Sequence, residues 1–408
     1  MRKFHPMTYG AIIGGSLLVA SSAIAGGFAI REQSTTGLGK AFADSAAGSD
    51  LSSMYWNPAA VTAEEGMNSV SSISGIISDT KVQPTAGTSF GLTGTTIDEF
   101  AVLGASYYNY QLNQQLYVGL SINSPLGLVT DAANRSWGGA TYNRRSEILT
   151  LNAAPTVGYK LTPNLSVAAG LQVEYMKARL TSAVPVGALF ANDIVIKGDD
   201  VAVGFTLGAL YKSENTGTSL GVGYRSSIHH NLEGTLHGHP VIAAGDIKAE
   251  LDTPEMVTVS LRQDVMSGLA LMANFEWSNW SRMKELRVKN KNGAADIVED
   301  FSWNDSWLIS FGAEYEIIDD LTLRTGLGFE KTPVPNSTRG ARLPDSDRVW
   351  LSLGGSYEWN ENTTLDFGYS HIFFDDSKIA LASATKGVLN ADVENSADIL
   401  SVGARIKW

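Results

Sequence analysis

The 408-residue chain contains no cysteine. Disulfide scaffolds and zinc sites built on thiolates are therefore excluded, and the absence suits a secreted chain that crosses an oxidising compartment unfolded. Basic residues are in the minority, because 30 Lys and Arg stand against 42 Asp and Glu and give a formal charge of -12. This charge argues against nucleic acid as a partner.

Long hydrophobic runs are also missing. Beyond residue 25 no run of about eighteen apolar residues occurs, so we expect no transmembrane helix. The first 25 residues combine basic Arg2 and Lys3, an apolar stretch over 11–20 and an A-x-A sequence ending at Ala25. This pattern predicts a signal peptide over 1–25 and a mature chain that begins at Gly26. An uncleaved anchor is the alternative, disfavoured because glycines and serines interrupt the apolar stretch.

What the sequence does contain is a two-residue period. After residue 66, segments of about ten residues place apolar side chains at alternate positions, as strands with two different faces do. In one of them Leu171 and Val173 alternate with Gln172 and Glu174. We count fourteen such segments, and we expect the apolar face to contact lipid. They begin near Met67, Glu99, Leu116, Ile148, Leu165, Val201, Ser219, Met256, Leu269, Ser306, Leu321, Arg348, Thr363 and Asp398.

A soluble β-sandwich would show the same alternation, so further features are needed. Aromatic residues such as Tyr159, Trp359 and the terminal Trp408 stand near strand ends, where bilayer interfaces would lie. The polar face is rich in glycine and small residues, which suits a crowded lumen. Short turns near 112–114, 162–164, 214–216, 266–268, 319–320 and 360–362 alternate with longer connections around 80–97, 126–147, 180–199, 230–250, 282–304, 331–346 and 375–396. These features predict an all-β fold, a 14-stranded antiparallel transmembrane β-barrel over 67–408 in the outer membrane of a Gram-negative bacterium.

Residues 26–66 lack the two-residue period. They are rich in Gly, Ala and Ser but include Phe28, Leu38, Tyr55 and Trp56, which makes them more apolar than a solvated linker. The lumen of a barrel of about fourteen strands is too wide for side chains alone to fill. We therefore predict an N-terminal hatch, a plug in the lumen. A loose periplasmic tail is the alternative.

Residues 27–62 carry a resemblance to a known family. The segment includes Phe28 as the third mature residue, Glu32, the run beginning Gly37-Leu38-Gly39, and the motif Asn57-Pro58-Ala59. It resembles the amino-terminal hatch of the FadL family of outer-membrane transporters for hydrophobic compounds. Two later stretches are also similar to that family, and together they extend the resemblance over nearly the whole mature chain. They are Ser124-Pro125-Leu126-Gly127-Leu128 and Leu343-Pro344-Asp345-Ser346-Asp347-Arg348-Val349-Trp350.

This resemblance implies fourteen strands, a luminal hatch, and passive uptake of long-chain fatty acids or aromatic hydrocarbons. It also implies lateral release through a gap in the third strand, at Asn123, Ser124, Pro125 and Gly127. Proline cannot donate to a strand ladder and glycine weakens it, so a gap there is physically reasonable. An ordinary strand end that turns into a loop is the alternative.

Candidate ligand-binding residues follow from the family resemblance and from the alternation of inward and outward faces. The resemblance implies that Phe28 reaches an interior site. Met176 and Met272 are apolar exceptions on the inward face, where methionine could adapt to an apolar ligand, although packing against the plug is the favoured explanation for each of them. A fatty-acid carboxylate would bind a cation. The candidates near the outer ends of the fourth and fifth strands are Arg144, Arg145, Lys177 and Arg179, with solvated loop charges or lipopolysaccharide contacts as alternatives. The family pattern Trp-x-Gly-Arg-Tyr is reduced here to Trp137-Gly138-Gly139-Ala140-Thr141-Tyr142.

Other classes of function are alternatives to transport. His229, His230, His237 and His239 could bind a metal ion, but in an outer loop they are expected to be solvated. No serine nucleophile is placed beside a base by spacing, so we expect no enzyme, no metal and no cofactor. A hatch argues against a general porin, while a surface receptor or adhesin role stays open. The expected partners are a hydrophobic ligand, outer-membrane lipid and lipopolysaccharide, and the barrel-assembly machinery, with the protein itself a monomer.

Overall fold

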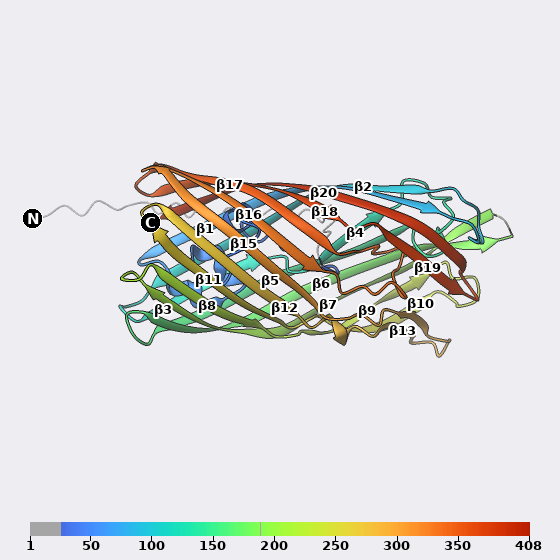
Figure 1. Cartoon of the computed structure of the whole chain (residues 1–408). Coiled ribbons are helices and arrows are strands. Elements are labelled where there is room, and N and C mark those ends of the chain that lie inside the picture. The colour runs from blue at the N-terminus through green and yellow to red at the C-terminus, as the bar shows by residue number, and fades with distance from the viewer. Residues whose placement is uncertain (1–25, 188) are drawn as a thin grey trace, which may run out of the picture.

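A computed structural model describes residues 26–187 and 189–408, so the predicted signal peptide over 1–25 lies outside the described residues. Its strands form one antiparallel sheet that closes on itself (Figure 1). β1 (Met67–Pro84) pairs with β2 (Thr95–Gln111) on one edge and with β20 (Gly387–Lys407) on the other. Because the first and last strands join, the sheet has no open edge, and the predicted 14-stranded barrel is confirmed.

The wall has fourteen strand positions, several of them interrupted. The strands between β2 and β20 that make up the wall are β3 (Leu116–Asn123), β5 (Arg145–Lys160), β6 (Leu165–Val186), β7 (Leu189–Ser213), β8 (Thr218–Arg225), β11 (Met256–Met266), β12 (Leu269–Ser278), β15 (Ser306–Ile318), β16 (Leu321–Lys331), β17 (Arg348–Asn360) and β18 (Thr363–Phe374). Shorter strands continue some of them toward the end with the long hairpins. These are β4 (Gly127–Asp131), β9 (His229–His237), β10 (Gly245–Asp252), β13 (Glu285–Asn290), β14 (Ile297–Asp300) and β19 (Ser377–Ser383).

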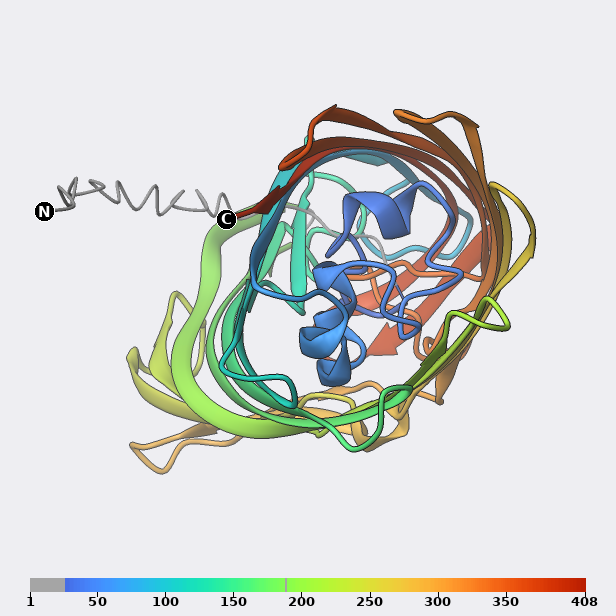
Figure 2. The same cartoon turned by 90° about the vertical axis from the view of Figure 1, so that its left-hand side faces the viewer.

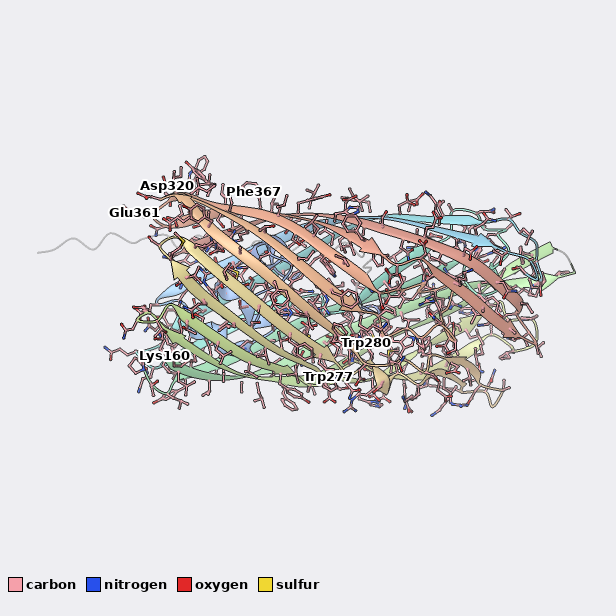
Figure 3. The ribbon with its side chains drawn as sticks, in the orientation of Figure 1. Lys160, Trp277, Trp280, Asp320, Glu361 and Phe367 are labelled. Atoms are coloured by element: carbon pink, nitrogen blue, oxygen red, sulfur yellow. The ribbon has the colours of Figure 1, made fainter. Side chains whose placement is uncertain are left out.

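The six tight turns fall where the sequence predicts them. Two of them carry Asp320 and Glu361, which lie at the same end of the molecule as Lys160 (Figure 3). Three strands begin clearly earlier than expected. β2 begins at Thr95 instead of Glu99, β7 at Leu189 instead of Val201, and β20 at Gly387 instead of Asp398. The ladder between β6 and β7 continues to Val186↔Leu189. Hydrogen bonding between two strands does not need an apolar face, so these strands extend past the segment with lipid-facing alternation.

Burial confirms the two faces of the wall. Outward Phe311 is 61% exposed and outward Val402 is 53% exposed, whereas inward Ser352 and Ser370 are 0% exposed. Phe367 points away from the wall in Figure 3. An apolar exterior around a polar interior is the reverse of a soluble domain and is the arrangement that hydrocarbon requires. No helix in the described residues is long and apolar enough to cross a membrane.

Aromatic residues mark two levels on this exterior. Tyr159, Tyr211 and Trp359 are exposed at the end with the tight turns. At the other level Tyr224 and Trp277 flank Val257 in register, and Trp307 lies opposite Trp277. Amphipathic rings favour the two bilayer interfaces, so the apolar band lies between these levels.

Residues 26–66, named here the luminal segment, lie inside the ring of strands (Figure 2). They form α1 (Thr35–Leu38), η1 (Leu51–Tyr55) and η2 (Pro58–Thr62), and nearly all of them are buried. The inner wall admits this backbone because it carries glycines. A Cβ atom on Gly221 would lie 1.6 Å from the Ala46 carbonyl oxygen, and one on Gly223 would lie 1.8 Å from that of Trp56. Only glycine permits so close an approach.

The Asn57-Pro58-Ala59 motif fixes the luminal segment to the wall. The Asn57 side-chain oxygen accepts a hydrogen bond from the Ala59 N–H at 3.0 Å and caps η2. Its Nδ2 donates to the Ala46 carbonyl at 2.8 Å and to the Ala209 carbonyl of β7 at 3.0 Å. One side chain therefore starts a helix, ties two parts of the segment together and joins them to a wall strand.

Candidate ligand-binding site

Three cavities lie inside the described barrel. Two of them share lining residues, and the third is lined by residues that follow Phe28 in the chain. The outer cavity has a volume of about 930 Å³ and is lined mainly by residues of the long hairpins. The inner chamber, about 80 Å³, shares Leu180, Ile196 and Trp303 with it. The lower pocket, about 50 Å³, is lined by Pro125, Ala29 and other residues next to the luminal segment. Together the cavities trace a path from the outer end toward the third strand.

The inner chamber is apolar and aromatic. Phe28 lines it, with ring centroids 4.9 Å from Trp280 and 5.6 Å from Trp303. Trp280 is buried, and in Figure 3 it lies at the end of β12 near Trp277. Ala29 and Ile30, the next two residues, line the lower pocket instead. Phe28 thus stands at the boundary between two cavities, in the interior position that the family resemblance implies.

Buried hydrogen bonds on one side of Phe28 and buried ion pairs on the other hold the chain in place. The Gly26 N–H donates to Glu330 Oε1 at 3.0 Å, and the Gly27 N–H donates to Asp345 Oδ2 at 3.1 Å. On the other side Arg31 contacts Glu276 at 2.6 Å and Glu330 at 3.0 Å. Each buried carboxylate needs a partner, because an isolated charge here would be strongly unfavourable. The stretch between Gly27 and Arg31 is therefore fixed at both ends.

Two cations share one carboxylate at the mouth of the inner chamber. Glu299 Oε2 lies 3.4 Å from Arg342 Nε and 3.8 Å from Lys386 Nζ. Arg342 and Glu299 line both the chamber and the outer cavity, and Lys386 lines the outer cavity. Burial alone would raise the pKa of Glu299, but the charges of Arg342 and Lys386 lower it below the usual glutamate range. This triad keeps one net positive charge beside an apolar space.

The sequence reasoning missed Arg342 and Lys386. The two residues lie in separate outer connections, and only the closed barrel brings them together. For Arg342 a signal existed, because it directly precedes the Leu343-Pro344-Asp345 stretch that resembles the family. Lys386 precedes the positive-φ Gly387 in a short turn and has no distinguishing pattern.

The wall is interrupted at the third strand. The ladder between β2 and β3 ends at the pair Ser106↔Ile122, although β2 itself continues to Thr95. The same register would place Ala105 opposite Asn123, the last residue of β3, and Leu103 opposite Pro125, which lies beyond the end of β3. In the described residues β4 pairs with β5 and forms no ladder with β2. The predicted exit residues therefore lie at a break in the wall.

The luminal segment pairs with this break from the inside. The Ile30 N–H donates to the Pro125 carbonyl at 2.8 Å, and the Gly127 N–H donates to the Phe28 carbonyl at 2.9 Å. Gln33 Nε2 adds a hydrogen bond to the Ser124 carbonyl at 2.8 Å. Backbone groups inside a membrane barrel must find partners, and here residues 28–30 supply them in place of a neighbouring wall strand.

The remaining predicted ligand residues separate into two groups. Met176 is 1% exposed and belongs to the apolar cluster that contains Phe28. Met272 instead packs with Ala43 and Ala270, and the structure does not bring it to the inner chamber. Arg144 lies inside the outer part of the barrel, where it pairs with Asp193 and lies over the Phe190 ring.

The structure does not place Arg145, Lys177 and Arg179 beside an apolar pocket, which corrects the expectation from the sequence. They share the outward face of their strands with Leu149 and Tyr175. Arg145 pairs with Asp131 at 2.6 Å on that face. The strand period places residues of equal parity on one face, so the assignment of Leu171 and Val173 to the apolar face already implied this direction for Lys177 and Arg179.

The histidines do not form a metal site in the described residues, which hold no group of three or more potential ligands. His230 is 0% exposed and lies 3.1 Å from Asp200 and 3.3 Å from Glu174. The expectation that it is solvated was wrong, because residues 229–237 form β9 and the odd–even period turns His230 inward.

A closed barrel with an apolar belt, a filled lumen and an apolar chamber defines an outer-membrane channel for hydrophobic compounds. The chain belongs to the outer membrane protein transport protein family (OMPP1/FadL/TodX), whose model matches residues 16–408. It is 26% identical over 400 residues to the long-chain fatty acid transport protein of Escherichia coli O6:H1, covering 87% of this chain and 88% of that one. Its location is the outer membrane, and its activity is transport of hydrophobic compounds.

Solved structures share the fold. A FadL homologue of Pseudomonas aeruginosa superposes with a TM-score of 0.83 at 21% identity, over 93% of this chain and 99% of that chain. The toluene transporter TbuX of Ralstonia pickettii superposes with a TM-score of 0.65 at 19% identity, over 91% and 100% of the two chains.

Proposed function

We propose that this protein takes up long-chain fatty acids, with the luminal segment as hatch and with lateral release at the third strand. The observation that carries the proposal is the triad of Glu299, Arg342 and Lys386. A carboxylate placed there would be held by charge-assisted hydrogen bonds from the two cations, while its alkyl chain enters the apolar chamber. A neutral hydrocarbon would gain nothing from that surplus charge.

The volumes support capture in stages. The outer cavity of about 930 Å³ can hold an acyl chain, whereas the chamber of about 80 Å³ holds only part of one until its lining moves. Each buried methylene contributes about 0.8 kcal/mol. Entry into the chamber therefore supplies a driving force that can displace the Phe28 side chain from Trp280 and Trp303.

The exit we propose runs from the lower pocket past Pro125. Ala101, Leu103 and Ala105, on the inward face of β2, are buried and apolar. The bonds from residues 28–30 to Pro125 and Gly127 close this passage, and shifting them would open it between β2 and the break. Ligand would then reach the bilayer sideways, without crossing the polar space at the tight-turn end.

Small aromatic hydrocarbons are a second candidate cargo. Phe28, Trp280, Trp303 and Phe301 form a connected ring cluster, with Phe301 and Trp303 centroids 5.3 Å apart. The small chamber volume also suits a single ring. Edge and face contacts with such a cluster would favour an aromatic ligand.

One binding experiment separates the two cargoes. Purified full-length protein is titrated with a long-chain fatty acid, the matching long-chain alcohol and toluene, before and after the double change Arg342→Gln plus Lys386→Gln. We expect fatty-acid affinity to fall roughly tenfold or more, because two charged hydrogen bonds are lost. Binding of the alcohol and toluene should stay nearly constant.

The exposed Lys378→Gln is the control, since Lys378 lies outside the cavities and is 83% exposed. Equal loss for all three ligands would show structural damage in place of head-group binding. Unchanged fatty-acid affinity, or tight binding of toluene alone, would contradict the fatty-acid proposal.

A further inference from the structure

Four cations, Arg145, Lys177, Arg179 and Lys197, lie together on the outward face of neighbouring strands. Of these, Lys197 also contributes to the lining of the inner chamber. Glu147, Arg179 and Lys197 lie opposite one another across β5, β6 and β7. Lys177 and Asp199 form the next row toward the tight turns, and Arg145 lies one row the other way. Adjacent strands are about 4.8 Å apart, so Lys177, Arg179 and Lys197 are close enough to share one bound group.

The charge of this patch is incompletely balanced. Arg145 contacts Asp131 at 2.6 Å and Glu147 at 3.3 Å, so both of these carboxylates are paired with Arg145. By contrast, Lys177, Arg179 and Lys197 make no ion pair within the described residues. Arg179 Nε is buried and has no hydrogen-bond partner in the described structure. A buried unused donor is unfavourable, and an anion would satisfy it.

The level of the patch on the barrel identifies the kind of anion. One row nearer the tight turns, Tyr175 lies opposite Val201. Beyond that pair the same face carries Leu171, which is 50% exposed, and Val203, which is 63% exposed. The cations thus stand at the rim of the apolar band, on the side of the long hairpins. In the outer membrane this is the headgroup level of the outer leaflet.

We propose that Lys177, Arg179 and Lys197 bind a phosphate of lipopolysaccharide, with the acyl chains of that lipid against Leu171 and Val203. The combination selects a lipid that has both a multiply charged phosphate and acyl chains. A zwitterionic phospholipid carries its own ammonium group and leaves the three cations less well compensated. Free phosphate would meet the same cations without the apolar contacts.

Another sector of the barrel, formed by β1 and β20, provides a natural comparison. There Asp79, Asp392 and Glu394 face outward on β1 and β20 and are exposed. The cations of that sector are accompanied by carboxylates, since Lys81 lies 3.9 Å from Asp79 and Lys378 lies 3.5 Å from Asp392. Compared with this sector, the sector of β6 and β7 therefore carries more cations without an ion pair, although Asp199 lies opposite Lys177.

The test compares Lys177→Gln, Arg179→Gln and Lys197→Gln combined in one variant with a control variant that combines Lys81→Gln and Lys378→Gln. Binding of rough lipopolysaccharide, its dephosphorylated form, phosphatidylethanolamine and inorganic phosphate to detergent-solubilised protein is measured by native mass spectrometry and titration. Each cation near a lipid surface contributes about fivefold, so the triple change should weaken lipopolysaccharide binding roughly a hundredfold. The control variant should bind it as the parent does.

Dephosphorylation should weaken binding to the parent protein to the level of the triple variant, and inorganic phosphate alone should bind weakly. Fatty-acid binding should be unchanged in the double variant Lys177→Gln plus Arg179→Gln, because neither residue lines the inner chamber or the outer cavity. This separates the proposal from the transport proposal and shows that the barrel is folded. Equal lipopolysaccharide affinity in parent and triple variant would overturn the inference. Equal affinity for dephosphorylated lipopolysaccharide would do so as well.

Discussion

The two halves of the luminal segment are attached in different ways. Residues 35–62 form α1, η1 and η2 and pack their backbone onto wall glycines such as Gly221 and Gly223. Residues 26–33 have no helix and are held by ion pairs and by two backbone hydrogen bonds to the break near Pro125. Residues 35–62 are thus packed closely against the wall, whereas residues 26–33 are attached to it at a few defined points and border the cavities.

This difference assigns separate tasks to the two halves. The backbone of residues 35–62 is in close contact with wall glycines, so we propose that these residues stay in place during transport. The stretch between Gly27 and Arg31 is fixed at both ends but carries Phe28 at the boundary between chamber and lower pocket. Rotation of the Phe28 side chain, with bowing of residues 28–30, can open the path while the ion pairs stay intact.

Deletion of the luminal segment should have the largest effect, because it removes both attached parts at once. Deletion of residues 26–60 should raise the passage of small hydrophilic solutes by an order of magnitude or more, because side chains alone cannot fill a lumen of this size. The conductance of single barrels in planar bilayers measures this passage, with the unaltered protein as the control. Unchanged conductance would show that the segment does not block the lumen.

Closing the break should abolish hydrophobic uptake. The double change Pro125→Val plus Gly127→Val restores a backbone donor and β-forming side chains, which favours a continuous third strand paired with β2. Cells carrying the variant should lose uptake of a radiolabelled fatty acid while barrel yield in the outer membrane stays normal. Thr325→Val, on the outward face of β16, is the matched control. Full uptake with both changes in place would rule out release at this point.

The sequence predicted the wall well, because the two-residue period is imposed locally by lipid on one face and the crowded lumen on the other. The same period accounts for the inward serines Ser352 and Ser370, which are both buried in the structure. It was less informative where lipid no longer constrains the outward face, which is why the starts of β7 and β20 were placed too late. Strand pairing there depends on the neighbouring strand, which no local pattern shows.

The binding site was only partly predictable. Phe28 and Pro125 were found through the family resemblance, and the structure brings their neighbourhoods together through the bridge between Ala29 and Leu126. Arg342 and Lys386 were missed because closure of the ring, and no spacing along the chain, places them beside Glu299. Arg145, Lys177 and Arg179 were chosen for charge, although their parity already placed them outside.

The fit of residues 35–62 to the wall can be tested at one glycine. Gly223→Ala would place a Cβ 1.8 Å from the Trp56 carbonyl oxygen and so force backbone atoms apart. We expect a loss of about 1–3 kcal/mol in stability and faster proteolysis of the luminal segment. Thermal unfolding and limited proteolysis of the purified barrel measure both. Gly75→Ala is the control, since its Cβ would lie 3.3 Å from the outward Phe100 ring. Equal behaviour of the two variants would mean that the segment is not tightly seated.

The smallest expected effect concerns Phe28 itself. Phe28→Ala removes the ring that lies against Trp280 and Trp303, so the chamber should open toward the lower pocket and ligand should pass severalfold faster. The ring cluster should also lose rigidity, which tryptophan fluorescence of the purified protein reports. Phe28→Leu keeps much of the apolar volume and should give an intermediate rate. If uptake falls with Phe28→Ala and recovers with Phe28→Leu, the ring serves to hold ligand in the chamber and the gate lies in the backbone bonds from residues 28–30 to the break.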